Sequence, residues 1–307
     1  MSVEKVERSE FPKILKELLL NPDYLFVTAG LKFHLDNILE LELSFHLWRL
    51  KDGDRVVYCY VKRNEHKSLI HMESNCYEYG FCQKIADSFG ETLFEFVNKA
   101  DYVFAFAILQ PLCGLLEEKF LEMGLKKSHP FLTMSDEDNV YYIKESSRKM
   151  LEEKLLEIPK GYKWSTLKPA DAAEILSDQV YGKITSPKPY ERTLSLLPSV
   201  AVYTEANELA SYEFLDVSGM ITSQYTRPIH RHQGIGSAVE WKLCQEAWKK
   251  TNLIPFKAVS KNRKRVIKLS DNSPLWTQRH DENGIPTTGK FFMYCKKEMP
   301  KIEFYEN

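Results

Sequence analysis

A glycine turn between a strand and a helix is the feature that most constrains how this chain can fold. Residues 225–250 read YTRPIHRHQGIGSAVEWKLCQEAWKK: a strand ends near Thr226, a turn closes at Gly234-Ile235-Gly236, and an amphipathic helical pattern follows. Such a turn leaves backbone N–H groups unpaired at the positive end of the helix, and glycine lets an anion approach them closely. The stretch therefore predicts a site for a phosphate or diphosphate.

Spacing separates the phosphate-binding motifs that could occupy this turn. A dinucleotide-binding turn needs G-x-G-x-x-G, but position 239 is Val, so the third glycine is absent. A P-loop needs Gly-Lys-Ser/Thr, but Gly236 is followed directly by Ser237. The alternative without any ligand is a tight turn that only packs the helix against the strand.

The pattern that does fit is Arg231-x-x-Gly234-x-Gly236, with Pro228 three residues before the arginine. It resembles the coenzyme A loop of the GNAT superfamily of N-acyltransferases, whose consensus is roughly V-x-P-x-x-R-x-x-G-x-G/A. A narrower resemblance, to the glycine N-acyltransferase branch, rests on Tyr212-Glu213, Asp216, Gly219, Pro228, Arg231, Ile254-Pro255-Phe256 and Asn262. It implies an enzyme that transfers an acyl group from acyl-CoA to the amine of glycine or another small amino acid or amine, without a metal.

The resemblance also implies which residues bind the cofactor. Main-chain groups of two strand-end residues would bond the pantetheine, and the loop would hold the diphosphate; the expected set is Tyr225, Thr226, Arg231, His232, Gln233, Gly234, Ile235, Gly236, Ser237 and Asn262. Asn262 is alternatively the cap of the helix that follows it. His230 and His232 lack further ligands at metal spacing, so we expect them to contact phosphate or solvent and not zinc.

The expected proton-transfer groups depart from the family. A glutamate serves as base in the glycine N-acyltransferases, but the corresponding residue here is Met220, and a thioether cannot take a proton. Water held by Thr222, Gln224 or Glu213 could replace it, or the amine could arrive already deprotonated. Ser270 is the candidate general acid, with a helix-terminating serine as the alternative. Loss of the usual activity would leave a catalytically silent acyl-CoA-binding or interaction protein on the same fold.

Composition narrows the class of protein. The 42 basic and 43 acidic residues nearly balance, which argues against a general nucleic-acid-binding protein. No apolar run approaches the roughly 20 residues that cross a bilayer, so we expect no membrane partner. The 6 cysteines form no CxxC pair and no signal-peptide pattern is present, as expected for a cytoplasmic protein with reduced thiols. The family resemblance makes mitochondrial import the alternative. We expect a monomer.

Length and local pattern predict a mixed α/β fold in two parts. The 307 residues suggest an N-terminal α/β domain over 1–145, a linker helix over 146–161 and a GNAT acyltransferase domain over 162–307. The first half lacks the glycine loop, so it is either a degenerate copy of the GNAT fold or an unrelated α/β domain. Within it, residues 24–34 read as an extended apolar segment, and residues 79–99 as a helix.

Overall fold

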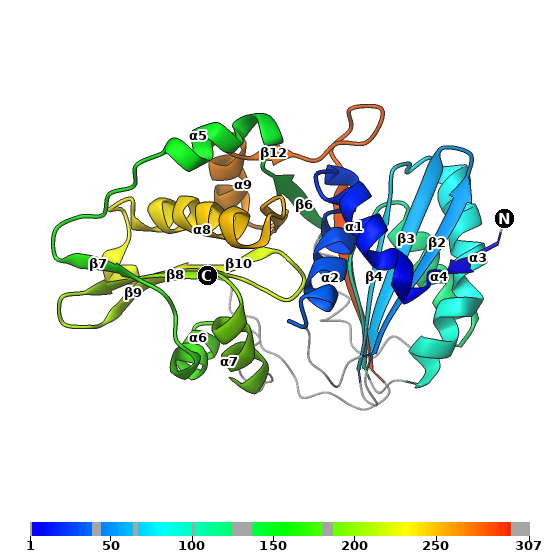
Figure 1. Cartoon of the computed structure of the whole chain (residues 1–307), viewed down its shortest axis with the longest axis horizontal. Helices are drawn as coiled ribbons and strands as arrows, with labels where there is room; N and C mark the ends of the chain where they lie inside the picture. Colours follow the sequence, from blue (N-terminus) through cyan, green and yellow to red (C-terminus); the bar gives the residue numbers. More distant parts are fainter. Residues whose placement is uncertain are drawn as a thin grey trace. The chain divides into compact units, whose positions relative to one another are not determined.

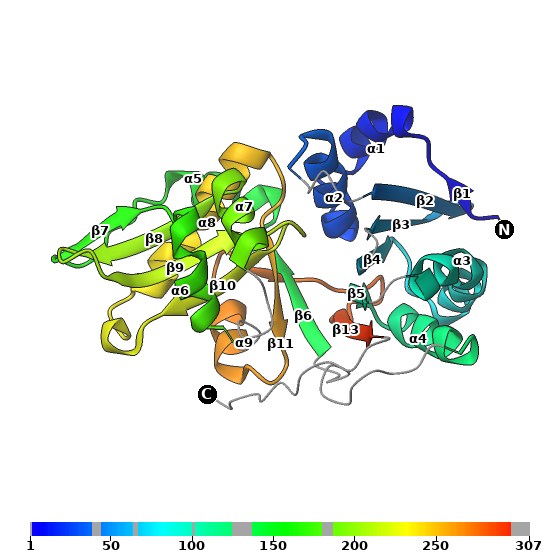
Figure 2. The same cartoon turned by 90° about the horizontal axis from the view of Figure 1, so that it is seen from below.

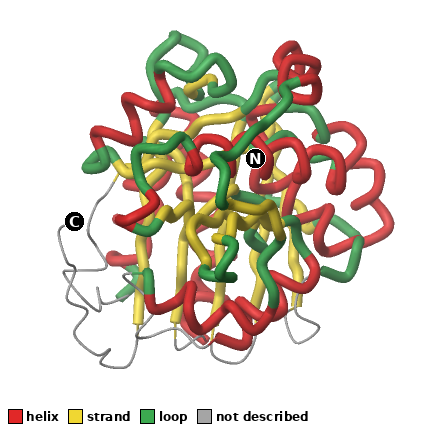
Figure 3. Tube along the Cα trace, turned by 90° about the vertical axis from the view of Figure 1, so that its left-hand side faces the viewer, coloured by secondary structure: helices red, strands yellow, loops and turns green. Residues whose placement is uncertain are grey.

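A computed structural model describes residues 2–38, 44–63, 67–99, 102–124, 137–179 and 187–295. Figure 3 marks the helices, strands and loops along this trace. Among the helices in these ranges, none is long and apolar enough to span a bilayer.

The described residues form two compact units. The first takes the residues up to Tyr142 and those from Ala258 onward, and the second takes Ile143–Lys257. The sequence pattern instead predicted that residues 162–307 form one domain. Its residues from Ala258 group with the first unit because strand β13 (Thr288–Cys295) pairs antiparallel with β5 (Tyr102–Leu109) and with β6 (Glu137–Tyr142). The division into domains stays a prediction.

The first unit is built on a nine-stranded sheet, although Phe256 and Lys257 at the start of its strand β11 are counted with the second unit. Its order is β1-β2-β3-β4-β5-β13-β6-β11, with β12 paired to β6. The remaining strands are β1 (Glu4–Lys5), β2 (Ser44–Asp52), β3 (Arg55–Arg63), β4 (Lys67–Ser74), β11 (Phe256–Ser260) and β12 (Thr277–Gln278). Helices α1 (Phe11–Leu18) and α2 (Leu25–Leu35) lie on one side of β2–β5, and α3 (Tyr79–Lys99) and α4 (Leu112–Glu122) lie on the other (Figure 2). Helix α9 (Lys264–Asp271) belongs to the same unit.

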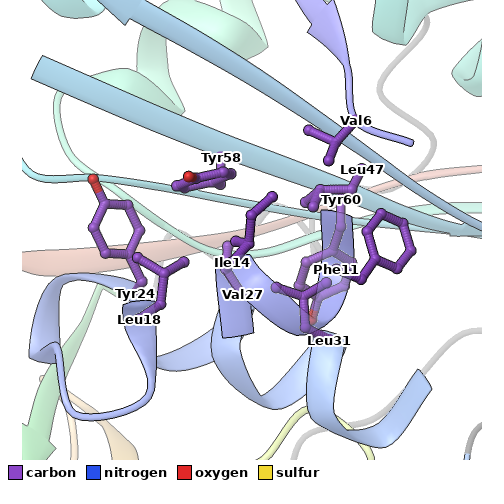
Figure 4. Close-up of a cluster of buried hydrophobic side chains, with 10 residues drawn as sticks. All are labelled: Val6, Phe11, Ile14, Leu18, Tyr24, Val27, Leu31, Leu47, Tyr58 and Tyr60. Carbon is purple, nitrogen blue, oxygen red and sulfur yellow. The ribbon is translucent and has the colours of Figure 1, made fainter. Parts of the chain in front are cut away.

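A buried apolar cluster joins α1 and α2 to β2 and β3 (Figure 4). Its members are Val6, Phe11, Ile14, Leu18, Tyr24, Val27, Leu31, Leu47, Tyr58 and Tyr60. Helix α2 approaches β3 so closely that a Cβ on Gly30 would lie 2.7 Å from the Tyr60 ring. Only a glycine allows this contact.

The extended segment expected over residues 24–34 is wrong. The structure has a 3₁₀ turn over Pro22–Tyr24 followed by α2. Residues 25–31 and Phe33 are all buried, so the helix has almost no polar face and shows no amphipathic period. A short, continuous apolar run does not distinguish a buried helix from a buried strand, so the sequence pattern alone could not identify this helix.

The second unit is a four-stranded antiparallel sheet between helices. The strand order is β10-β9-β8-β7, formed by β7 (Tyr162–Ser165), β8 (Ser199–Thr204), β9 (Leu209–Leu215) and β10 (Ile221–Thr226). Helix α8 (Ile235–Thr251) lies along one face, and α6 (Ala172–Ser177) and α7 (Pro187–Leu196) lie along the other (Figure 1). Helix α5 (Arg148–Glu153) precedes the sheet and is joined to α8 where Gln245 donates to the Leu151 and Lys154 carbonyls.

The two halves of the chain share one strand–helix–strand order. In the first half, β4 runs through α3 to β5, which pairs parallel to it. In the second half, β10 runs through α8 to β11, and Met220, directly before β10, forms a parallel bridge with Phe256, the first residue of β11. The connection from β4 to α3 contains no glycine between Ser74 and Tyr79, so the first half lacks the turn that makes the second a phosphate-site candidate.

Candidate functional site

Strand β10 offers an open and irregular edge. It is the last strand of its sheet, and the Met220–Phe256 bridge is its one pairing on the outer side among the described residues. Its register with β9 shifts between Thr222 and Tyr225, and Ser223 has a φ of +59°. This is a β-bulge, which leaves backbone groups outside the ladder. The outer edge therefore has N–H and C=O groups available to an extended ligand.

The loop that follows β10 ends on an uncapped helix. A 3₁₀ turn covers Pro228–His230, His232 has a φ of +62°, and Gly234 has a φ of +78° at the N-cap of α8. No side chain of the described residues caps this helix end. The first N–H groups of α8 thus have neither a helical nor a side-chain acceptor, and they lie at the positive end of a 17-residue helix.

The two glycines of the motif serve different purposes. Nothing lies within 4 Å of a Cβ placed on Gly234, so this position requires glycine for its positive φ. A Cβ on Gly236 would lie 3.0 Å from Oγ1 of Thr226, so this glycine is needed for close approach. The Gly236 carbonyl accepts a 3.0 Å hydrogen bond from Nε2 of Gln224, which ties the first turn of α8 to the bulge.

Arg231 turns back from the loop onto the end of β10. Its Nε donates to the Thr226 carbonyl at 2.9 Å, and its guanidinium carbon lies 5.7 Å from the centre of the Tyr225 ring. The arginine is exposed, as are His232, Gln233 and Ser237. These four side chains are therefore accessible from solvent.

Other predicted site residues are placed differently. The Ile235 side chain is buried, so only its backbone could contribute to the predicted site. The Tyr225 carbonyl accepts from the Ser211 hydroxyl at 3.0 Å, and that hydroxyl also shares a 2.8 Å hydrogen bond with Thr226. Sequence reasoning missed Ser211, because nothing in its local pattern distinguishes it from other small strand residues.

His230 does not lie at the surface with the rest of the loop, so the expected phosphate or solvent contact is wrong for this residue. It is only 8% exposed, and its Nδ1 lies 2.9 Å from the hydroxyl of Tyr162. The ring points into the unit, whereas His232 is exposed as expected. Tyr162 is 68 residues away in the chain, so no local signal could have identified this pair.

Asn262 and Ser270 belong to the first unit, whereas the glycine loop belongs to the second. Asn262 is exposed, its N–H donates to Ser260 Oγ at 3.2 Å, and the N-cap of α9 is Arg263 instead. Ser270 is 1% exposed, and its hydroxyl donates to the Val266 carbonyl at 3.0 Å. This back-bonding geometry favours the helix-terminating role for Ser270. Its catalytic role stays a prediction.

Neither Met220 nor Glu213 is a ready proton acceptor. Met220 is buried. Glu213 is 2% exposed, and its Oε2 has no hydrogen-bond partner among the described residues. Burial first, and the nearby carboxylate of Glu240 second, raise the pKa of Glu213 well above its usual range. Lys257 opposes this shift, but its Nζ is bound to Glu240 at 2.6 Å. The Glu213 carboxyl therefore favours its neutral, protonated form.

Comparison with known proteins shows which fold this is. No family model matches the chain, and no curated protein sequence is similar to it. A Drosophila protein solved in a structural genomics programme superposes with a TM-score of 0.69 at 11% identity, over 95% of this chain and 98% of that one. A tandem GNAT protein from the clavulanic acid biosynthesis pathway gives 0.52 at 12% identity, over 95% and 97%.

A GCN5-related N-acetyltransferase from Sphaerobacter thermophilus gives a TM-score of 0.50 at 13% identity, over 98% of this chain and 97% of that one. At such identities the likeness concerns the fold. The predicted fold is confirmed: the chain is a mixed α/β protein with the GNAT fold, matched over nearly its whole length.

Proposed function

We propose that this chain is an acyl-CoA-dependent N-acyltransferase whose acceptor is glycine or another small amine. The observation that carries the proposal is the uncapped N terminus of α8, placed directly after the open, bulged edge of β10. An anion-binding helix end beside unpaired strand groups suits a ligand with a diphosphate at one end and an amide-rich arm at the other. Two proteins of the same fold are described as a tandem GNAT protein and an N-acetyltransferase.

Each part of the site has a role in this proposal. The N–H groups of Ile235, Gly236 and Ser237 hold the diphosphate, and Arg231 adds a positive charge. His232 and Gln233 contact the same group from the exposed side of the loop. Main-chain groups near Tyr225 and Thr226 bond the pantetheine arm and polarise the thioester carbonyl. Anchoring the cofactor at both ends fixes the reacting carbon, and positioning of this kind supplies much of a rate enhancement. The contact of Asn262 with the cofactor stays a prediction.

The reaction replaces a carbon–sulfur bond by a carbon–nitrogen bond. The amine nitrogen attacks the thioester carbonyl carbon, the tetrahedral intermediate collapses, and the coenzyme A thiolate leaves and is protonated. The amine must be neutral to attack. Met220 cannot take a proton, and Glu213 is only 2% exposed, so in this proposal the amine enters already deprotonated and the proton that it loses after the attack leaves to solvent.

This mechanism predicts a specific pH dependence. We expect kcat/KM to rise with pH at a slope of about one on logarithmic axes and to level off at the pKa of the acceptor amine itself. Two acceptors of different basicity should then give midpoints that differ by the difference in their pKa values. Steady-state rates from pH 6 to 10 measure this. A midpoint common to all acceptors would instead indicate a base on the protein.

Ser270→Ala tests the general-acid prediction. Because the hydroxyl is buried and donates to Val266, we expect the variant to keep kcat within about twofold of the wild type. Single-turnover rates of thiol release with saturating amine measure it. A loss of about 100-fold, with the affinity for acyl-CoA unchanged, would assign the serine to catalysis.

Release of free thiol from acetyl-, benzoyl- and longer acyl-CoA with a panel of amines tests the function as a whole. The proposal expects release that depends on both substrates and yields the amide. The second candidate is an acyl-CoA-binding protein without activity, which the buried Met220 in place of a base favours. Binding of acyl-CoA without release in any pairing would support that candidate and contradict the proposal.

A further inference from the structure

One buried side chain holds the middle of the exposed loop that follows β10. In residues 227–234, all of which the structure describes, His230 is the one buried residue. Its neighbour Ile229 is 79% exposed, and Arg231 through Gly234 are exposed as well. A loop with so few packed side chains has a low free energy of local opening unless something fixes it.

Tyr162 supplies that fixed point. Its hydroxyl shares a 2.9 Å hydrogen bond with Nδ1 of His230, and the two rings meet edge to face with centroids 5.5 Å apart. Tyr162 begins β7, and its backbone pairs with Thr204 of β8. In strand order β7 is the edge opposite β10. The loop is therefore tied to the far edge of the sheet from which it emerged.

The loop's other bonds lie within its turn or at its two ends. Within the turn, the His230 N–H donates to the Arg227 carbonyl and the Arg231 N–H to the Pro228 carbonyl. The Arg227 guanidinium pairs with Glu174 of α6. Arg227 N–H donates to the Ala210 carbonyl, and Arg231 Nε returns to Thr226, so both act on the strand side. Gln224 bonds the Gly236 carbonyl at the helix side. Arg231 ties the turn back to the strand that it follows, whereas the Tyr162–His230 pair ties it to a different strand, β7.

We propose that Tyr162 and His230 are positioning residues that hold the loop in its diphosphate-binding shape before the ligand arrives. The inference rests on the proposed function, since it assigns the loop to coenzyme A. A loop ordered in advance loses less conformational entropy when the anion binds, so the affinity is higher than for the same groups on a mobile loop. The pair would act on binding without touching the ligand's reacting atoms.

Tyr162→Phe removes only the hydroxyl and keeps the ring against His230. The matched control is Tyr203→Phe, which removes a tyrosine hydroxyl bonded at 3.0 Å to Asp171 in the same unit. We expect Tyr162→Phe to raise amide hydrogen exchange over residues 228–236 in the ligand-free protein by about tenfold and to weaken coenzyme A binding about 5- to 10-fold. Tyr203→Phe should change neither.

A double-mutant cycle with His230→Phe separates a shared bond from general damage. If the pair acts through its hydrogen bond, the double variant should bind coenzyme A no more weakly than the weaker single variant. A Tyr162→Phe protein that matches the wild type in both exchange and affinity would overturn the inference while the proposed function stands. Increased exchange in Tyr162→Phe together with no binding of coenzyme A by any variant or the wild type would leave the anchor in place and refute the proposed function.

Discussion

Gly234→Asp is expected to lower the affinity for coenzyme A by at least about 100-fold. The residue sits at the N-cap of α8 with a φ of +78°, a conformation that costs a residue with a Cβ about 1 kcal/mol. Its side chain would enter open space where we place the diphosphate. A carboxylate there would also accept hydrogen bonds from the N–H groups of the first turn, as N-cap aspartates do, and would repel a second anion. Equilibrium dialysis with coenzyme A measures the loss.

Two further substitutions separate backbone strain from charge. Gly234→Ala adds only the Cβ and should weaken binding about tenfold or less. Gly284→Asp is the matched control, because Gly284 also has a positive φ of +75°, and nothing lies within 4 Å of a Cβ placed on it. It lies outside the loop, so binding should not change. Equal affinity in Gly234→Asp and the wild type would contradict the assignment of the loop.

Arg279→Met is expected to destabilise the first unit by about 3–5 kcal/mol. Arg279 is 3% exposed; one guanidinium nitrogen lies 3.3 Å from Oε1 of Glu73, and the other donates to the Asp23 carbonyl at 2.8 Å. Glu73 is 1% exposed, and its Oε2 accepts from the N–H of Val27 in the first turn of α2. Removing the arginine leaves a buried carboxylate without its counter-charge, which is far more costly than losing a surface pair.

The destabilisation by Arg279→Met should increase as the pH rises. Burial raises the pKa of Glu73 from its usual 4.5 to about 7, although Arg279 opposes the rise. A carboxyl whose pKa is higher in the folded than in the unfolded protein stabilises the fold fully at a pH below its unfolded-state pKa. This stabilisation is lost as the pH rises through its folded-state pKa. Without Arg279 the pKa rises further. The difference between variant and wild type should therefore be smallest near pH 5 and largest above pH 7.

Urea unfolding at pH 5 and pH 8 measures both expectations. Lys149→Met is the control, because Lys149 Nζ lies 3.8 Å from Glu153 Oε1 and both side chains are mostly exposed. We expect this variant to lose less than about 0.5 kcal/mol of unfolding free energy. A loss of less than about 1 kcal/mol in Arg279→Met at pH 8 would contradict the buried ion pair as a determinant of stability.

The site's local elements were predictable because short-range patterns encode them. The strand ends at Thr226 as expected, and the helix begins at Ile235, within the glycine turn expected to close at Gly236. Helix α3 spans the expected residues 79–99. The mixed α/β GNAT fold is also confirmed. These features depend on residues that are neighbours in the chain, or on the glycine motif, which determines the local backbone conformation.

Features that depend on distant contacts were not predictable. Helix α2 is buried on almost all sides, so its sequence has no amphipathic period from which a helix could be predicted. The Arg279–Glu73 pair joins residues 206 positions apart, and the Tyr162–His230 pair joins residues 68 apart. Likewise, no local pattern indicated that β13 would pair between β5 and β6 and thereby draw the residues from Ala258 onward into the first unit.

Titration calorimetry of the purified wild-type protein with coenzyme A tests the central claim most directly. The account predicts a saturable heat of binding with a one-to-one stoichiometry and a Kd in the micromolar range. Such a Kd corresponds to a binding free energy on the order of −8 kcal/mol. Competition by 3′-phosphoadenosine 5′-diphosphate, which carries the diphosphate without the pantetheine arm, should reduce that heat. An absence of heat with coenzyme A and with every acyl-CoA tried would contradict it.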